Sequence, residues 1–193
     1  MSEATESAIE EKEKDRTVAL IIAIFALFLA LAEAGAKKAQ HLSTEKNIEA
    51  SDLFNFYQAK KVRSTIAETA AGMLEAEKTA LADPKAQEAF EKRIGDFKSA
   101  VAQFEHDPKK PEDSLEAIQD RAKEAVEARE LANRRLEHYE LGSGLFQIAI
   151  VLASAAIITG IATLMWLSVA LGVVGAVLAA FGFFAPTVLS FIG

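Results

Sequence analysis

The chain has 193 residues, a formal net charge of −7 and no cysteine. The absence of cysteine excludes disulfides, thiol catalysis and cysteine-ligated metals, and the acidic balance argues against nucleic acid as the main partner. Hydrophobic residues make up 51% of the chain, but they gather in residues 17–31 and 145–193, while the charges lie elsewhere. This segregation is typical of an integral membrane protein.

The N-terminal part predicts an acidic tail followed by a membrane span. Residues 1–16 are highly charged and hold nothing that can be buried, so we expect a flexible or frayed helical tail. Residues 17–35 predict the first transmembrane helix, because they are apolar over about the length of one span. A cleaved signal peptide is the alternative, but an acidic leader and a late cleavage position favour a retained anchor.

Residues 36–141 predict a helical soluble domain, because they are rich in Ala, Glu and Lys. Breakers divide this domain into helices at about 44–82, 84–105 and 113–141. Asp83 and Pro84 supply an N-cap and a first-turn proline. The prolines between residues 106 and 111 predict a loop, and Asp113 with Glu116 has the spacing of a capping box.

The first and third of these helices both carry apolar stripes. Since each meets the membrane at one end, they must run antiparallel, as a helical hairpin or coiled coil; an ordinary small bundle is the alternative. The second helix must fold back along this pair or lie across its tip. The stripe expected on the third helix is Leu115, Ile118, Ala122, Ala125, Arg129, Ala132, Leu136 and Tyr139. The stripe expected on the first is Phe56, Ala59, Ile66, Ala70, Met73 and Ala80.

Residues 145–193 contain no charged residue, which predicts two further spans, unless they form a buried hairpin in a soluble fold. We expect transmembrane helices at 145–164 and 169–186, a turn at about Met165–Ser168, and an apolar C-terminal tail at 187–193. Gly142 and Gly144 allow a bend at the start of the second span. Small residues favour close helix packing in a membrane, within one chain or between chains. The candidates are Ala153, Gly160, Gly172, Gly175 and Gly182.

Lysine and arginine near the span ends predict the orientation. More of these residues flank the predicted soluble domain than the N-terminal tail. The positive-inside rule therefore favours a cytoplasmic domain and a translocated tail.

One cluster near the membrane-proximal end of the first soluble helix predicts a binding role. It joins aromatic, amide and basic groups, which suits a protein partner or anionic lipid headgroups. An amphipathic helix with its lysines in water is the alternative. The cluster consists of Asp52, Tyr57, Gln58, Lys60, Lys61 and Arg63.

Catalytic motifs are missing from the sequence. It holds no phosphate-binding glycine loop, nucleophile elbow or HExxH motif. Its histidines, His41, His106 and His138, are isolated from one another. We therefore expect a protein that is not an enzyme and has no cofactor and no metal site.

Two stretches carry a resemblance to a known family. Asn47–Lys60, with Gln58-Ala59-Lys60 as its most specific part, and Ala149–Ser154 resemble the bacterial membrane proteins grouped as domain of unknown function 4337. The resemblance covers nearly the whole chain, although Leu53 and Phe54 stand where a tryptophan would be expected. It implies a bacterial membrane protein, and it implies no activity. With several expected spans, we place the protein in the bacterial inner membrane as a multi-pass protein.

These observations predict an all-α integral membrane protein with three transmembrane helices and a helical hairpin or coiled-coil soluble domain. The expected function is that of a membrane-anchored structural or adaptor protein, a homo-oligomer that presents its helical domain to a protein partner. The alternative is a small oligomeric channel or transporter subunit. A channel would have few polar side chains within its spans to depend on, namely Gln147, Ser154, Thr159 and Thr163.

Overall fold

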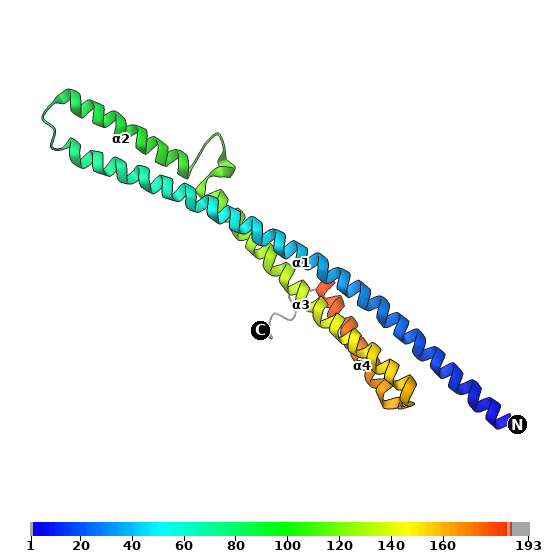
Figure 1. Ribbon diagram of the computed structural model, residues 1–193. Coiled ribbons are helices and arrows are strands. Elements are labelled where there is room, and N and C mark those ends of the chain that lie inside the picture. The colour runs from blue at the N-terminus through cyan, green and yellow to red at the C-terminus, as the bar shows by residue number, and fades with distance from the viewer. Residues whose placement is uncertain (1, 185, 187–193) are drawn as a thin grey trace. The chain divides into compact units, whose positions relative to one another are not determined.

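The computed structural model describes residues 2–184 and residue 186, with residues 2–12 and 14 described as backbone alone. This part of the chain is all-α (Figure 1). Its α-helices α1, α3 and α4 are long and apolar enough to cross a membrane, by length and composition. The elements are α1 (Ser2–Lys78), α2 (Pro84–Glu105), the 3-10 turn η1 (Pro111–Asp113), α3 (Leu115–Thr159) and α4 (Ala162–Phe184).

Side-chain caps set the start of α2 and the start of α3. Asp83 accepts a hydrogen bond from the backbone N–H of Lys85 (3.0 Å) and caps α2. At α3 the expected capping box is wrong, because Asp113 lies in η1. Ser114 caps α3 instead, since its hydroxyl accepts a hydrogen bond from the N–H of Ala117 (3.2 Å). A serine hydroxyl at the N-cap can accept a hydrogen bond from the first turn of the helix. Unlike the aspartate before it, the serine carries no charge.

Helix α1 is uninterrupted. It includes residues 2–16, for which we expected a flexible or frayed helical tail, and it continues through Gly35 and the polar residues 37–43. The sequence left open whether the first apolar segment joins the first soluble helix, and the structure joins them. Alanine, leucine and glutamate throughout this stretch favour the helical state.

The turn between α3 and α4 lies earlier than expected. Helix α3 passes Gly142 and Gly144 without a break and ends at Thr159, and the expected turn at Met165–Ser168 is wrong because these residues are inside α4. Gly160 has a φ of +67°, the left-handed region, where it ends a helix without steric cost. The predicted C-terminal tail, residues 187–193, lies outside the described residues.

The chain forms two compact units. Unit 1 combines the residues up to Thr44 with those from Arg129 onward, and unit 2 is Glu45–Ala128. Unit 2 is therefore inserted between two stretches of unit 1. Within unit 1, the hydroxyl of Ser43 donates a hydrogen bond to the side-chain carbonyl of Asn133 (2.5 Å). We expected a soluble domain between residues 36 and 141, the positions at which the chain would leave and re-enter a membrane. These limits stay a prediction.

Unit 1 packs around aromatic and small side chains. Phe25 and Ala32 of α1 form its core with Phe146 and Ala149 of α3. The ring of Phe146 lies 6.1 Å from that of Phe25 and stacks on Phe28 at 5.9 Å, centroid to centroid. Leu171, Ala176 and Ala179 of α4 pack against this core. The apolar segments thus associate through a few aromatic rings set among small residues.

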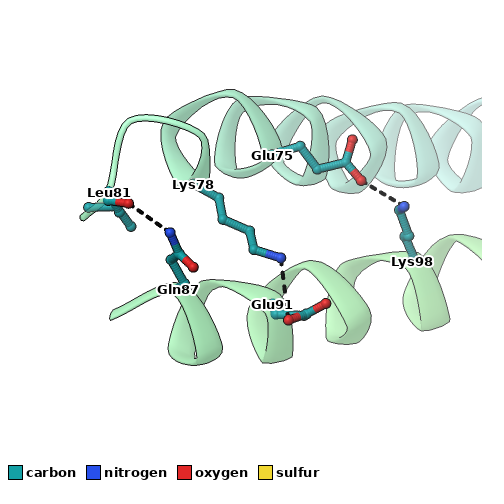
Figure 2. A network of polar contacts seen from close by, with 6 residues as sticks. All are labelled: Glu75, Lys78, Leu81, Gln87, Glu91 and Lys98. Atoms are coloured by element: carbon teal, nitrogen blue, oxygen red, sulfur yellow. Dashed lines mark hydrogen bonds and ion pairs between the residues drawn. The ribbon is translucent and has the colours of Figure 1, made fainter. Parts of the chain in front are cut away.

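In unit 2, α3 packs against the earlier part of α1 and α2 packs against its last turns. Leu53 of α1 packs on Ile118 and Ala122 of α3, whereas Glu75 and Lys78, farther along α1, form ion pairs with α2 (Figure 2). Helix α2 therefore folds back along the end of α1, as Figure 1 shows in green beside cyan.

The face that α1 turns inward in unit 2 is not the expected one. Phe56, Ile66 and Met73 of the expected stripe are 43%, 62% and 68% exposed. The stripe expected on α3 is confirmed in this unit, where Leu115, Ile118, Ala122 and Ala125 are buried. Small side chains let two helices approach closely, so the larger apolar ones stay outside. The inward face of α1 consists of Ala50, Leu53, Tyr57, Lys60, Ser64, Ala67, Ala71 and Leu74.

Candidate functional site

The predicted binding cluster is spread around α1 in unit 2. Tyr57 packs against the buried residues between α1 and α3. Lys60 donates a hydrogen bond to the carbonyl oxygen of Asp113, and its ammonium lies 5.9 Å from the centroid of the Phe56 ring. The remaining members are exposed: Asp52, Gln58, Lys61 and Arg63. The structure thus uses Tyr57 and Lys60 in packing, and a binding role for the cluster stays a prediction.

Asp52 lines a shallow groove of about 550 Å³ between α1 and α3, which also includes Glu49 and Arg121. On its α1 side, Lys46 and Glu49 form an ion pair at 2.7 Å. The hydrogen bond between them raises the pKa of Lys46 and lowers the pKa of Glu49, and their mutual attraction acts in the same sense. Both groups thus stay charged at neutral pH, which suits a fixed charge pair and not proton transfer.

A second, larger groove lies between α1 and α2 in unit 2. We call it the hairpin groove; its volume is about 720 Å³. Glu77 and Arg93 bring charges of opposite sign, and neither forms an ion pair among the described residues. Its lining is otherwise apolar. The residues are Ala70, Met73, Leu74, Ala76, Glu77 and Ala80 of α1 with Arg93 and Phe97 of α2.

Polar contacts hold α1 and α2 together (Figure 2). Lys98 pairs with Glu75 at 2.7 Å, and Glu91 pairs with Lys78 at 3.3 Å. Gln87 also donates a hydrogen bond to the carbonyl oxygen of Leu81, in the loop between the two helices, at 2.7 Å. When the residues of both helices are labelled a to g in a heptad repeat, Glu75, Glu91 and Lys98 take position e. The groove residues Glu77 and Arg93 take position g. In an antiparallel pair these positions lie on opposite edges, so ion pairs close one edge and the hairpin groove opens on the other.

The small residues predicted to pack helices together do so within unit 1, with one exception. Ala153 is fully buried. A Cβ built on Gly172 would lie 2.2 Å from the Phe25 ring, and one on Gly175 would lie 3.1 Å from the carbonyl oxygen of Gly142. Gly160 is exposed and serves the turn instead. These contacts join α1, α3 and α4 of one chain; that they do so inside a membrane stays a prediction.

Gly182, the last of that group, borders a pocket of about 290 Å³ in unit 1. We call it the span-end pocket, because its residues come from the same end of each apolar segment. Sequence reasoning missed it, since no local motif marks it. Its lining consists of Gly35, Lys38, Ala39 and Leu42 of α1, Arg135 and Tyr139 of α3, and Gly182 and Phe183 of α4.

The ring of Tyr139 separates two helices in the span-end pocket. A Cβ built on Gly35 would lie 2.8 Å from Tyr139 Cζ, and one on Gly182 would lie 3.3 Å from Tyr139 Cε1. Among the described residues, the buried Nε of Arg135 and Nε2 of His138 have no hydrogen-bond partner. Because buried donors are nearly always satisfied in proteins, the Nε–H of Arg135 marks a place that an acceptor would suit.

Metal chemistry has no supporting geometry in the part of the chain that the structure describes. No group of three or more His, Cys, Asp or Glu side chains could hold a metal ion there. The ring Nδ1 of His138 lies 2.6 Å from the carbonyl oxygen of Arg134 in its own helix. The expectation that the protein is not an enzyme and has no cofactor stays a prediction.

Comparison with known proteins gives one match. No curated protein and no solved structure matches the chain. The family described as "Domain of unknown function (DUF4337)" matches residues 14–185, which reach from α1 to the end of α4. This match confirms the resemblance carried by Asn47–Lys60 and Ala149–Ser154. The chain therefore belongs to the DUF4337 family.

Proposed function

We propose that this protein is a membrane-anchored structural or adaptor protein of the bacterial inner membrane. It self-assembles through unit 2 and presents the resulting helical surface, on the cytoplasmic side, to a partner protein. The observation that carries the proposal is the hairpin groove, an apolar surface left open in a two-helix layer. The length and composition of α1, α3 and α4 support the anchoring.

The α1–α2 layer leaves too much apolar surface open for two helices alone. Phe90, Phe97 and Phe104 recur every seven residues along one face of α2 and are only half-buried. Met73, which lines the hairpin groove, is 68% exposed. A helical layer buries its apolar face fully when another layer covers it, and exposed apolar surface of this kind marks interaction sites.

The charges of the hairpin groove favour a second copy of the chain as the occupant. In a two-fold pair each surface meets itself, so that Glu77 of one copy can lie opposite Arg93 of the other, and the reverse. The pairing satisfies both charges twice. It also joins two hairpins into a four-helix layer that covers Met73 and Phe97.

The mass of the purified protein in mild detergent tests this proposal. We expect a defined oligomer for the native chain, and a smaller species for Glu77→Arg, because like charges then meet across the interface. The double variant Glu77→Arg/Arg93→Glu should restore the oligomer. Glu88→Arg makes the same charge change on the exposed side of α2 and should leave the oligomer intact.

A native chain that is monomeric under these conditions would refute self-assembly. Loss of the oligomer in the double variant would show that the two charges do not face each other. Crosslinking in native membranes, followed by mass spectrometry, then identifies the protein partner that the adaptor role requires.

Two of the polar residues on which the alternative, a channel subunit, would depend bond within their own helix. The hydroxyls of Ser154 and Thr159 donate hydrogen bonds to carbonyls of their own helix, Ile150 and Ala155. The hydroxyl of Ser168 donates a hydrogen bond to another helix, at the carbonyl oxygen of Ala149. A flux of ions through reconstituted protein that changes in Gln147→Leu would favour the channel over the scaffold.

A further inference from the structure

We propose that the span-end pocket binds the phosphate group of an anionic phospholipid. The inference rests on the proposed membrane anchoring of α1, α3 and α4. The residues of the span-end pocket come directly after the apolar segment of α1, directly before the apolar segment of α3 and at the end of α4. A bilayer that covers these segments places its headgroups at the level of the pocket.

The charge of the pocket suits a phosphate. Lys38 and Arg135 both line it, and no acidic residue does. Lysine supplies a compact ammonium and arginine a planar fork of donors, and the two together are a common way to hold phosphate oxygens. Basic pockets between membrane helices are known to take lipid headgroups.

An unsatisfied donor points to the same ligand. The Nε of Arg135 is buried and has no partner among the described residues. A buried donor without an acceptor costs stability, and a small shift of the Arg135 side chain would bring this donor to a phosphate oxygen. His138 lies next to Gly182 on the same helix turn as Arg135, but it does not line the pocket and is not part of the proposed site.

The ring of Tyr139 shapes one side of the pocket. Tyr139 is in close contact with Gly35 on one helix and Gly182 on another, so its ring is held between them. The ring, which belongs to α3, therefore fills the space between α1 and α4 at this level. A side chain held in this way loses little freedom on binding, which favours affinity.

The apolar part of the lining selects a lipid over free phosphate. Leu42 and Phe183 line the pocket with the two cations, and Phe183 is exposed. A phospholipid brings acyl chains that can lie against such side chains, whereas inorganic phosphate leaves them in water. The expected ligand is thus a lipid with a net negative headgroup.

Thermal unfolding in detergent measures the binding. Phosphatidylglycerol, phosphatidylcholine and inorganic phosphate are added separately to the purified full chain. We expect phosphatidylglycerol to raise the unfolding temperature in a saturable way, and the other two to have little effect. In Lys38→Gln and in Arg135→Gln the half-saturating lipid concentration should rise roughly tenfold, since each removes a charge-assisted hydrogen bond.

Lys37→Gln provides the matched control, because Lys37 is exposed on the same turn of α1 and does not line the pocket. Its half-saturating concentration should equal that of the native chain. An equal loss in Lys37→Gln and Lys38→Gln would overturn the site in favour of general attraction to basic residues. The same shift with inorganic phosphate would overturn the lipid and leave a phosphate site. If Arg135→Gln does not fold, Lys38→Gln decides alone.

The two proposals fail separately. A chain that is monomeric yet keeps the saturable lipid shift, lost in Lys38→Gln, would sink self-assembly and support the pocket. A chain that assembles but shows no lipid shift would sink the pocket and leave self-assembly standing.

Discussion

The hydroxyl of Ser168 donates a hydrogen bond to the backbone carbonyl oxygen of Ala149, 2.7 Å away, and both residues are fully buried. The bond joins α4 to α3 in the middle of their contact. It uses a carbonyl that already accepts within its own helix, so the hydroxyl adds a contact that neither helix can make alone. A serine at this place keeps the two backbones close.

Ser168→Ala should therefore lower the free energy of unfolding by about 1 kcal/mol, the usual net value of one hydrogen bond. Circular dichroism during thermal unfolding in detergent measures the effect. Ser143→Ala is the control, because the Ser143 hydroxyl donates only to Glu140 in its own helix. Equal losses in the two variants would show that the bond between the helices contributes nothing specific.

Gly172 should not tolerate a side chain. A Cβ there would lie 2.2 Å from Phe25 Cζ, so Gly172→Ala should cost about 1–3 kcal/mol through overpacking. Shortening the opposing ring in Gly172→Ala/Phe25→Leu should return part of that loss. Gly144→Ala is the control, because a Cβ built on Gly144 would have nothing within 4 Å. The control should gain stability, since alanine favours a helix over glycine.

Gly160→Ala tests the turn between α3 and α4. A φ of +67° costs a residue with a Cβ about 1–2 kcal/mol, so the variant should unfold more easily. Gly95→Ala changes a helical glycine that has open space around it and should stabilise the protein. Unchanged stability in Gly160→Ala would mean that the turn forms without the left-handed residue.

The Lys46–Glu49 ion pair predicts a defined dependence on pH. The pKa of Glu49 is lowered, so its contribution is present above the ordinary carboxyl pKa and is lost as the pH falls through the lowered value. The pKa of Lys46 is raised, so its contribution is present below the ordinary lysine pKa and is lost as the pH rises through the raised value. The pair thus acts across neutral pH.

Lys46→Met should return the pKa of Glu49 toward its ordinary value, as measured by NMR titration of the carboxyl carbon. Arg121 also lowers the pKa of Glu49, but the hydrogen bond from Lys46 is the larger cause. Arg121→Met should therefore raise the pKa of Glu49 less than Lys46→Met does. The reverse order would assign the shift to α3.

Sequence patterns were sufficient where the signal is local. Asp83 and Pro84 mark the start of α2 through the cap and the fixed proline φ, and neither depends on distant contacts. Leu115 and Ile118 likewise mark the inward face of α3, because they are large apolar residues in a polar helix.

The inward face of α1 in unit 2 could not be found in this way. Ala67 and Ala71 are buried there, whereas Ile66 and Met73 lie outside. Hydrophobic periodicity weights large side chains, but close helix contact selects small ones. The turn at Gly160 was missed for a related reason, since one glycine in a block rich in glycine does not reveal which of them takes a positive φ.

The span-end pocket has no signature in sequence because its parts are far apart. Lys38, Arg135 and Gly182 belong to different helices and meet only when these helices pack. The hairpin groove had a partial signal, since Ala70, Met73 and Ala80 belong to the stripe that we placed on the wrong side. The role of Arg93 and Glu77 depends on which edge the ion pairs close, which only packing shows.

The hydrogen bond between Ser43 and Asn133 has a further effect on folding. It lies in unit 1, at the point where the chain leaves for residues 45–128 and returns from them. Once the apolar helices associate, the two ends of residues 45–128 are already held together. The helical segments at these ends then meet at the effective concentration of a tethered pair. The entropy of loop closure grows only slowly with length, so residues added at the Pro108–Pro111 loop should change the stability of unit 1 very little.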